Sequence, residues 1–329
     1  MKSSTIAILG SGSWGTAVAV HLANCGNRVL LWGHRADEAQ QMQAERRNAR
    51  YLPDVTFPKH LVVQAELTPC IEQAEIVIIA VPSHAFASLL QQLPTSLKNL
   101  AWLTKGIDPL TNHLLSDLVM TKWGTEFPLA IISGPSFARE VAKFLPTALT
   151  VAGNNTHYSE TIRSLLHHNN LRAYVADDII GVQLCGAVKN VLAIACGMSD
   201  GMQYGANAKA ALITRGLAEM TRLGIELGAK ADTFMGLAGV GDLVLTCTDD
   251  QSRNRRFGLK LGQGLSLEQA EQEIGQVVEG KHNAAQVCSL AQKHKVEMPI
   301  CKVVNAIIQG KISAKEAVAN LMNRPPKME

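Results

Sequence analysis

The stretch "LGSGSWGTA" constrains the fold most, because its glycines stand at positions 10, 12 and 15 in G-x-G-x-x-G register. It directly follows a short apolar run at 5–9 and opens an amphipathic stretch that ends at Gly26. A strand, a tight glycine turn and a helix in succession are typical of the first βαβ unit of a dinucleotide-binding sheet. Gly10 permits the turn, Gly12 lets backbone approach a pyrophosphate, and Gly15 lets the helix pack closely on the strand. The alternative is a glycine turn that serves packing alone.

The first half of the chain repeats this alternation of strand and helix. Short β-branched runs, apolar at successive positions, occur at 5–9, 28–32, 61–64, 75–81, 101–104, 129–133 and 147–153. Strands buried on both faces have this pattern, and amphipathic stretches fill the gaps between them. The pattern predicts an α/β domain with a doubly wound parallel sheet of the Rossmann type.

Strand signals stop after about residue 178. Helical patterns follow, including "GAVKNVLAIACGMSDG" and "NAKAALITRGLAEMTRLGIELG", and capping-box patterns at 266–269 and 313–316 predict two further helix starts. We therefore expect a dinucleotide-binding domain over residues 1–178 and a mostly α-helical, substrate-binding domain over residues 179–329.

Composition narrows the class of protein. The net charge is +3 and the pI is near 8.4, too mild for a nucleic-acid-binding protein, which usually has a pI above about 9. Seven scattered cysteines without a C-x-x-C pair argue against a disulfide framework and against a zinc site, so we expect no metal. The N-terminus lacks a signal-peptide pattern, and the apolar run at 76–81 is far shorter than the roughly 20 residues of a membrane helix. We expect a cytoplasmic protein without membrane insertion.

The end of the second predicted strand bears on the type of dinucleotide. A site selective for NAD places a carboxylate there, to accept a hydrogen bond from the ribose 2′-hydroxyl. Here His34 and Arg35 follow the strand, whereas Asp37 and Glu38 come later, within the next predicted helix. A positive side chain favours a 2′-phosphate, so we predict NADPH as the preferred cofactor, with NADH also possible. The alternative is that Arg35 is a solvated surface residue and both cofactors are used.

Lys189 interrupts the apolar stretch "GAVKNVLAIACG". A charged amine in a segment that is otherwise suited to burial is costly unless it is paired or used. Its neighbours one helical turn away are Cys185, Gly186, Leu192 and Ala193. Three of these are small, which leaves a hollow around the amine for a ligand. A tight helix crossing with Lys189 extending outwards to solvent explains the pattern equally well.

The segment "LAGVGDLVLTCTDDQSRNRRFG" is a glycine-rich polar stretch within the helical half. Its candidate functional residues are Asp242, Thr246, Ser252, Arg253 and Asn254. Such a stretch in a compact domain is more often functional than idle, and an arginine beside an asparagine can bind phosphate oxygens. A solvated basic helix face accounts for Arg255 and Arg256.

Two segments follow predicted strands of the first domain. Lys105 comes just after the fifth strand, and "SGPS" places Gly134 and Ser136 after the sixth, where Pro135 and Ser136 suggest a new helix start. In a doubly wound sheet the carboxyl ends of the strands face the ligand crevice. A lysine or another cation near that edge could meet the negative charge that grows on a carbonyl oxygen during hydride transfer.

The motifs "GSGSWGTA", "LTKGI", "SGPSFARE", "GAVKNVLAIACG", "NAKAALITRGLAEM", "GDLVLTC", "SRNRRFG" and "QVVEG" occur in order between residues 6 and 280. In this combination the chain resembles the bacterial NAD(P)-dependent sn-glycerol-3-phosphate dehydrogenases. The resemblance implies reversible reduction of dihydroxyacetone phosphate to sn-glycerol 3-phosphate, which supplies phospholipid synthesis. It also implies a Rossmann domain followed by a helical domain, assembled as a homodimer.

Carried onto this sequence, the resemblance implies that Lys189 is the proton donor or acceptor at the C2 oxygen. Asp242 would hold and polarise this lysine with support from Asn190 and Thr246, and Lys105 would stand near both substrate and nicotinamide. The residues that would bind the substrate phosphate or line its pocket are Gly134, Ser136, Ser252, Arg253 and Asn254. Those that would contact NADPH, besides the three glycines, are Ser13, Trp14, His34, Arg35, Lys105, Ala138, Arg253, Val277 and Glu279.

Two other readings remain open from the sequence. A 3-hydroxyacid dehydrogenase or a ketopantoate-type reductase also combines two such domains with a helix-borne lysine, and fold alone does not separate them. A non-catalytic NADPH sensor would use the helical domain to bind a protein, but it leaves the lysine, carboxylate and arginine without a role.

Overall fold

The computed structural model describes residues 3–323 and residue 325. Contacts divide the chain into two compact units, the first comprising residues 1–105 and 114–182 and the second residues 106–113 and 183 onwards. The division thus falls inside the helix α8 (Ile179–Gly201), four residues after the expected boundary. The loop at 106–113 joins the second unit although it lies within the first domain along the sequence, because domain membership depends on packing and not on chain order.

The first unit is built on an eight-stranded sheet of order β10-β9-β8-β7-β6-β1-β2-β5. Its strands are β1 (Thr5–Leu9), β2 (Arg28–Trp32), β5 (Leu61–Gln64), β6 (Ile76–Ile79), β7 (Leu100–Trp102), β8 (Leu129–Ser133), β9 (Thr147–Gly153) and β10 (Leu171–Ala176). All neighbouring pairs are parallel except β8 and β9. The predicted doubly wound, mainly parallel sheet is therefore confirmed, and its one antiparallel pair arises because only the short helix α6 (Ala138–Ala142) lies between the two strands and cannot recross the sheet.

Three strands, at two places in the chain, were missed by the sequence pattern. β10 is an edge strand whose side chains alternate between buried and exposed, with Arg172 and Tyr174 outside. The short strands β3 (Arg47–Asn48) and β4 (Leu52–Thr56) form a separate antiparallel ribbon. Neither has the continuous apolar run of central strands such as β6 and β8, which are buried along their whole length.

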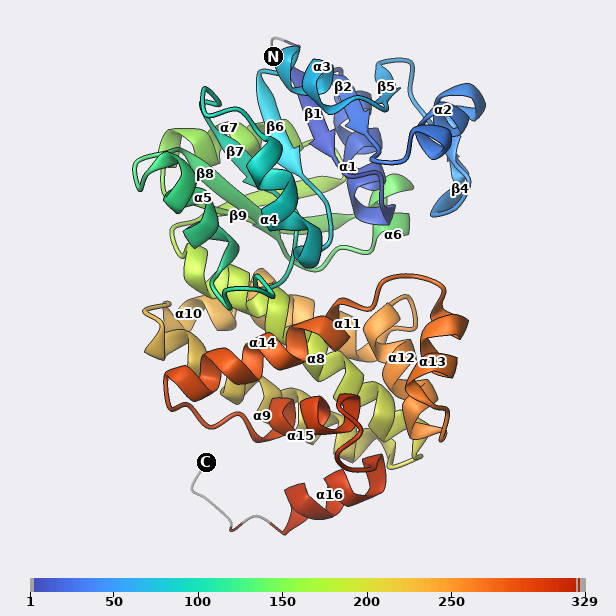
Figure 1. Ribbon diagram of the computed structural model, residues 1–329, viewed down its shortest axis with the longest axis vertical. Helices are drawn as coiled ribbons and strands as arrows, with labels where there is room; N and C mark the ends of the chain where they lie inside the picture. The colour runs from blue at the N-terminus through green and yellow to red at the C-terminus, as the bar shows by residue number, and fades with distance from the viewer. Residues whose placement is uncertain (1–2, 324, 326–329) are drawn as a thin grey trace. The chain divides into compact units, whose positions relative to one another are not determined.

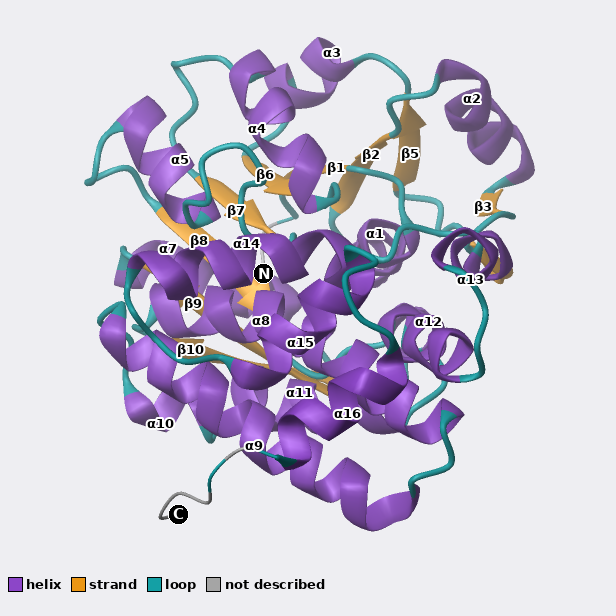
Figure 2. Ribbon diagram, turned by 60° about the horizontal axis from the view of Figure 1, so that its bottom comes forward, coloured by secondary structure: helices purple, strands orange, loops and turns teal. Residues whose placement is uncertain are grey.

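Helices cover both faces of the sheet, as the doubly wound prediction requires. Besides α6, the helices between the strands of the sheet are α1 (Ser13–Asn24), α2 (Ala36–Glu45), α3 (Leu67–Glu72), α4 (Ser83–Gln92), α5 (Leu115–Trp123) and α7 (Thr156–Leu166). α1 packs with α6 and α7 on one face, whereas α4 packs with α5 on the other (Figure 2). α1 ends just before Gly26, whose φ of 89° is the left-handed geometry predicted for a glycine after a helix.

The second unit is mostly α-helical, as predicted, and is assembled around α8 (Figure 1). The other helices are α9 (Gly205–Glu226), α10 (Ala231–Phe234), η1 (Leu237–Gly241), α11 (Asp242–Thr248), α12 (Arg253–Gly262), α13 (Leu267–Ile274), α14 (Glu279–Lys293), α15 (Pro299–Ile308) and α16 (Ala314–Met322). Both predicted capping boxes are confirmed, with Ser266 starting α13 and Ser313 starting α16.

α8 is the one helix among the described residues that is long and apolar enough to cross a membrane by length and composition. Its most apolar 18-residue window has a mean hydropathy of 1.8, and 89% of that window is buried inside the protein. Burial of this extent is that of a core helix, around which the other helices of the unit pack.

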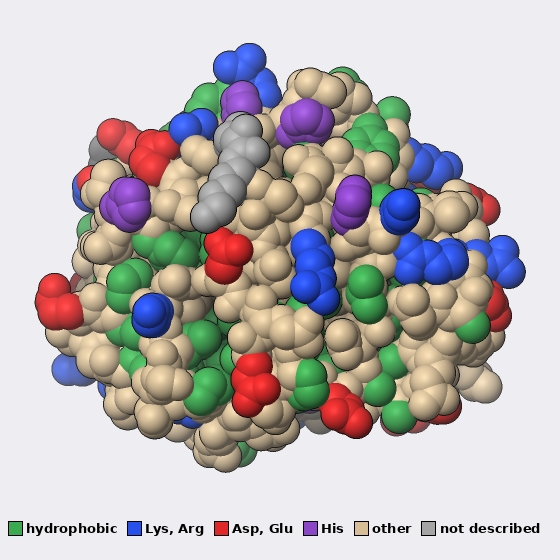
Figure 3. Space-filling view, turned by 90° about the horizontal axis from the view of Figure 1, so that it is seen from above, with side chains coloured by type: hydrophobic (Ala, Val, Ile, Leu, Met, Phe, Trp, Pro, Cys, Tyr) green, Lys and Arg blue, Asp and Glu red, His purple; other side chains and the backbone are tan. Residues whose placement is uncertain are grey.

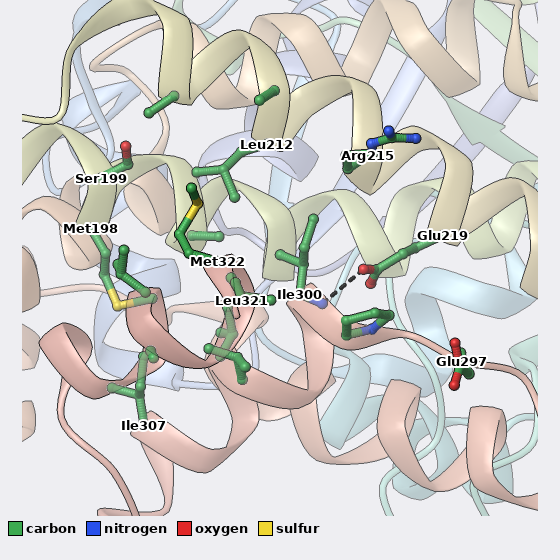
Figure 4. Close-up of a pocket in the computed structure, with 18 of the residues that line it drawn as sticks. Met198, Ser199, Leu212, Arg215, Glu219, Glu297, Ile300, Ile307, Leu321 and Met322 are labelled. Atoms are coloured by element: carbon green, nitrogen blue, oxygen red, sulfur yellow. Dashed lines mark hydrogen bonds between the residues drawn. The ribbon is translucent and has the colours of Figure 1, made fainter. Parts of the chain in front are cut away.

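A cavity of about 880 Å³ lies among α8, α9, α15 and α16 (Figure 4). Its walls are largely aliphatic, with Leu212 and Ile307 among them, but Glu219 of α9 also lines it. The buried Glu219 carboxylate accepts hydrogen bonds from the backbone N–H groups of Ile300 (2.7 Å) and Cys301 (3.3 Å). It thereby caps the first turn of α15 from a neighbouring helix, and burial raises its pKa to about 7.

The face drawn in Figure 3 carries both acidic and basic side chains, and several of the basic side chains lie near one another on its right-hand side.

Candidate active site

The loop between β1 and α1 has the geometry that its glycines predict. Gly10 has a φ of 129°, and a Cβ there would lie 2.7 Å from the Ala80 carbonyl oxygen. A Cβ on Gly15 would lie 2.1 Å from the carbonyl oxygen of Gly10, whereas a Cβ on Gly12 would meet nothing within 4 Å. Packing therefore requires two of the glycines, and the third leaves open space beside the backbone.

That open space adjoins the beginning of α1, which starts at Ser13. The first N–H groups of a helix have no partner within it, and together with the helix dipole they attract an anion. Because the loop is open at Gly12 and followed by the N–H groups of Ser13, Trp14 and Gly15, it fits the pyrophosphate of a dinucleotide.

Asn48 supports the glycine loop and was missed by the sequence. Its side-chain amide donates to the Ser11 carbonyl and to Thr16 Oγ1, both at 2.9 Å, and its Oδ1 accepts the N–H of Tyr51 at 3.3 Å. It belongs to the two-residue strand β3, far along the chain from the loop. No local pattern marks a residue that acts through such a distant contact.

The end of β2 carries the residues expected to distinguish the two cofactors. Arg35 occupies the N-cap position of α2 without a side-chain capping hydrogen bond, and both Asp37 and Glu38 lie within this helix, as predicted. The half-exposed Arg35 guanidinium lies 3.3 Å from Asp37 and 3.1 Å from Glu38, and the hydrogen bond with Asp37 raises its pKa above the usual value. Arg35 therefore stays positively charged, and it lies next to His34 in the segment between β2 and α2.

Lys105, Gly134 and Ser136 come together at the ends of β7 and β8. Lys105 Nζ donates to the Gly134 carbonyl oxygen at 3.1 Å, and Ser136 Oγ donates to the same oxygen at 3.0 Å. Gly134 has a φ of 126°, and a Cβ there would lie 3.3 Å from the Leu149 Cα. The close approach to Leu149 therefore requires a glycine here, and the Gly134 carbonyl oxygen accepts a hydrogen bond from each of the two polar side chains.

The helix predicted to begin at Pro135 and Ser136 begins instead at Ala138 and has only five residues. The left-handed Gly134 turns the chain before the helix can start, so the helix is shorter and begins later than predicted. Ala138 is the first residue of this helix.

In the second unit, Lys189 is buried and paired, which contradicts the interpretation that it extends into solvent. Only 6% of the residue is exposed, and Nζ lies 2.5 Å from Asp242 Oδ1 and 2.9 Å from Thr246 Oγ1. Asp242 is 1% exposed. Thr246 in turn donates to the Asp242 carbonyl oxygen at 2.6 Å, so that its hydroxyl oxygen is left to accept from the lysine.

A π-type turn positions Asp242. The segment η1 contains Gly239 at φ −87° and ψ −107°, outside helical geometry, and Asp242 begins α11 directly after it. A Cβ on Gly239 would lie 2.1 Å from the carbonyl oxygen of Phe234, a fully buried residue. The glycines of "LAGVGD" are therefore needed for close backbone packing, and the irregular turn aims the carboxylate at α8.

Asn190 and Asn254 are linked in a bridge that joins three helices. Asn254 Nδ2 donates to Asn190 Oδ1 at 2.9 Å, and Asn254 Oδ1 accepts the N–H of Gly280 at 2.8 Å. A Cβ on Gly280 would lie 2.4 Å from the Asn190 carbonyl oxygen. The bridge holds the start of α12 and the start of α14 against α8, beside Lys189.

The start of α12 also carries Arg253. Ser252 caps this helix by accepting the N–H of Arg255, and Arg253 reaches Gln276 at 3.4 Å, in the segment that leads to Val277 and Glu279. Glu279 is the first residue of α14, and Val277 is among the exposed large hydrophobic residues. The predicted substrate and cofactor residues of this unit therefore gather around the starts of α12 and α14.

Arg255 is not part of a solvated basic face, which is a correction to the sequence interpretation. It is 8% exposed, and its guanidinium lies 2.5 Å from Asp200 Oδ2 on α8 and pairs with Asp250 in the preceding loop. Sequence proximity to Arg253 and Arg256 suggested a surface stripe, but the partner at residue 200 is too distant along the chain to be anticipated.

The buried thiol near the lysine is not a nucleophile. A hydrogen bond with Cys196, and then burial, raise the pKa of Cys247 well above its ordinary value. A protonated thiol without solvent contact is unreactive, so Cys247 is not a candidate nucleophile.

A dinucleotide-binding sheet and a helical unit with a buried lysine–aspartate pair define the class of protein as a two-domain, nicotinamide-dependent dehydrogenase. Residues 5–159 match the model of the NAD-dependent glycerol-3-phosphate dehydrogenase N-terminus, and residues 178–319 match that of its C-terminus. The chain belongs to this family.

Individual relatives agree with the family assignment. The chain is 62% identical to a glycerol-3-phosphate dehydrogenase [NAD(P)+] of Legionella pneumophila strain Philadelphia 1, over the full length of both. It superposes on the crystal structure of glycerol-3-phosphate dehydrogenase from Coxiella burnetii with a TM-score of 0.95 at 49% identity, covering 98% of this chain and 99% of the other. A probable 2-dehydropantoate 2-reductase of Bacillus subtilis shares the fold alone, with a TM-score of 0.58 at 15% identity over 94% of this chain and 100% of the other.

Proposed function

We propose that this protein reduces dihydroxyacetone phosphate to sn-glycerol 3-phosphate, reversibly, with a nicotinamide cofactor. Family membership gives the reaction class, and the buried pair of Lys189 and Asp242 is the observation that carries the mechanism. The relative from Legionella bears the name of the same activity at 62% identity over its full length.

A bound reduced nicotinamide supplies the hydride for carbon C2 of the ketone. As the carbon accepts hydride, negative charge grows on the C2 oxygen and must be met by a cation or an acid. Lys189 Nζ does both, because it carries positive charge and can donate a proton to that oxygen. In the reverse direction the neutral amine accepts the proton from the C2 hydroxyl.

The neighbours of the amine fix its direction. Asp242 Oδ1 and Thr246 Oγ1 accept two of its hydrogen bonds, and Asn190 lies next to Lys189 on α8. Because Asp242 is buried and accepts from the lysine, it stabilises the ammonium form against the cost of burial. Asp242 is a positioning and electrostatic group in this scheme, and it does not itself exchange a proton with substrate.

Recognition of the phosphate falls to Arg253 and Asn254. An arginine presents a planar set of donors that suits phosphate oxygens, and the start of α12 adds backbone N–H groups. Ser252, which caps that helix, lines the same pocket in this proposal. In the first unit, Lys105, Gly134 and Ser136 contribute the contacts to the remainder of the substrate, and Lys105 also approaches the nicotinamide.

For the cofactor, we propose NADPH in preference to NADH, with both accepted. Gly10, Gly12 and Gly15, with Ser13 and Trp14, hold the pyrophosphate. His34 and Arg35 meet the 2′-phosphate. The remaining proposed contacts are Ala138, Arg253, Val277 and Glu279. Arg35 is already paired with two carboxylates, which weakens its field and allows NADH as well. Comparison of kcat/KM for NADPH and NADH tests the preference, and a clear advantage of NADH contradicts it.

The activity itself is tested by oxidation of NADPH on addition of dihydroxyacetone phosphate, with ketopantoate and 3-oxo acids as alternative substrates. We expect turnover with the phosphorylated ketone alone. Turnover with a carboxylate substrate and none with the phosphate contradicts the proposal. Absence of any oxidation favours a non-catalytic sensor.

The wider setting follows from the family resemblance. We propose that the protein works in the cytoplasm as a homodimer, takes a small phosphorylated substrate, and binds neither nucleic acid nor the membrane interior. Its product supplies the glycerol phosphate backbone of phospholipids.

A further inference from the structure

The helices α8 and α12 contact each other through their backbones. Cβ atoms on Gly197 and Gly201 of α8 would lie 2.0 Å from the Arg255 carbonyl oxygen and 2.3 Å from that of Leu259. On the other side, Cβ atoms on Gly258 and Gly262 of α12 would lie 2.0 Å from the Ile194 oxygen and 2.3 Å from the Met198 oxygen. We call these four glycines the glycine seam. No side chain separates the helices along this seam, so the body of α12 has little freedom to slide on α8.

The glycine seam ends before the residues that bind substrate. Its first contact on α12 is at Arg255, whereas Arg253 and Asn254 lie further towards the start of that helix. Helix termini fray where packing does not hold them, so side-chain interactions have to fix this end, and the bridge between Asn254 and Asn190 of α8 is one of them.

The Arg255 side chain provides a second such interaction. Its guanidinium lies 2.5 Å from Asp200 Oδ2, near the end of α8, and it also pairs with Asp250. Asp250 and Arg255 flank the segment Ser252–Asn254, so one guanidinium ties both ends of that segment to α8. The contact with Asp200 is the more important of the two, because both its groups are largely buried whereas the Asp250 side chain is 76% exposed.

We propose that Arg255 is a positioning residue for the substrate phosphate. It holds the start of α12 so that Arg253 and Asn254 stay at a fixed distance from Lys189, which sits on the same α8 that carries Asp200. This inference rests on the proposed function, because it takes Arg253 and Asn254 as the phosphate-binding residues. Lysine is a poor substitute, since a single ammonium cannot span the two carboxylates as a planar guanidinium does.

The test compares Arg255→Met, Arg255→Lys and Asp200→Asn with the unaltered enzyme. Lys209→Met is the matched control, because Lys209 also pairs with Asp200, at 2.9 Å, but belongs to α9. The measurements are kcat and KM for dihydroxyacetone phosphate at saturating NADPH, the inhibition constant of inorganic phosphate, and the thermal midpoint. All assays are run well below the lowest midpoint, so that unfolding does not contribute.

For Arg255→Met we expect KM for the ketone and the inhibition constant of phosphate to rise together by about tenfold, while kcat falls less than about threefold. Arg255→Lys and Asp200→Asn should give smaller increases in the same direction, and Lys209→Met should leave KM unchanged. A loss of thermal stability with unchanged KM and phosphate inhibition would show that Arg255 is merely structural and overturn the inference. If Arg255→Met does not fold, Arg255→Lys and Asp200→Asn decide by the same criterion.

Arg253→Ala separates this inference from the function on which it rests. If Arg253→Ala raises KM but the Arg255 and Asp200 variants do not, the positioning role is wrong and the phosphate site stands. If Arg253→Ala leaves both KM and phosphate inhibition unchanged, the assignment of the phosphate site fails first, and the inference fails with it.

Discussion

Substitution of Lys189 by methionine tests the proposed catalytic role of the lysine separately from its structural role. Methionine retains most of the length of the side chain but removes the charge and the transferable proton. A positioned general acid accelerates a reaction about 10²–10⁴-fold, so we expect kcat to fall by at least that factor. Cofactor binding should be retained, because the glycine loop belongs to the first unit and makes no use of Lys189.

The same substitution should also destabilise the fold. Removing Lys189 leaves the Asp242 carboxylate 1% exposed and without its cation. Removing one partner of a buried ion pair lowers the free energy of unfolding by about 3–5 kcal/mol, a large part of the 5–15 kcal/mol that is typical of a domain. Burial without the lysine would raise the pKa of Asp242 above its unfolded value. The folded variant would then hold a proton that the unfolded chain releases, and its stability would fall as pH rises between the two pKa values.

The double variant Lys189→Met/Asp242→Asn provides the control. It has no unpaired charge, so we expect most of the lost stability to return while turnover stays at the level of the single variant. Urea unfolding at pH 5 and pH 8 measures the stability, and oxidation of NADPH measures turnover. Recovery of turnover in the double variant, or a single variant that retains more than a tenth of the original kcat, would refute the assignment of Lys189 as the acid.

Three other predictions concern the cofactor loop, its selectivity and a buried acid. Gly12→Ala should leave the thermal midpoint nearly unchanged but weaken NADPH binding about tenfold or more, because its Cβ enters open space where the pyrophosphate would lie. Gly15→Ala should instead lower the thermal midpoint strongly, since its Cβ would lie 2.1 Å from a backbone oxygen. Titration of NADPH fluorescence and thermal unfolding check this pair, and equal effects of the two variants on stability would contradict it. Arg35→Glu should lower kcat/KM for NADPH at least tenfold while that for NADH changes little, because a carboxylate repels the 2′-phosphate; parallel losses for both cofactors would count against the role of Arg35. Glu219 has a pKa of about 7 in the fold, against 4.5 for an ordinary glutamate. Ionisation of this buried carboxylate should therefore lower the free energy of unfolding as pH rises from about 4.5 to 7, by at most roughly 3 kcal/mol. Glu219→Gln should remove this pH dependence of the free energy of unfolding, measured by urea unfolding between pH 5 and 8.

Much of the first unit could be predicted because its signals are local. Five strands, β1, β2, β5, β8 and β9, have the bounds that their apolar runs predict. The glycine loop and the two capping boxes behave likewise, because a turn or a helix start depends on residues within a few positions of one another. The direction of β9 beside β8 was not predictable, because it depends on where the connecting chain can cross the sheet.

The candidate site divides in the same way. The sequence by itself determined that Lys189 is either paired or extended to solvent, since an amine buried within an apolar helix is costly without a partner. Only the tertiary structure decided that the partner is Asp242, which is 53 residues away and is aimed by an irregular glycine turn. It likewise decided that Arg255 is buried against Asp200 and that Asn48 supports the glycine loop. Periodicity and spacing report which face of a helix or strand is apolar, whereas the partner of a buried polar group depends on how closely distant backbones approach.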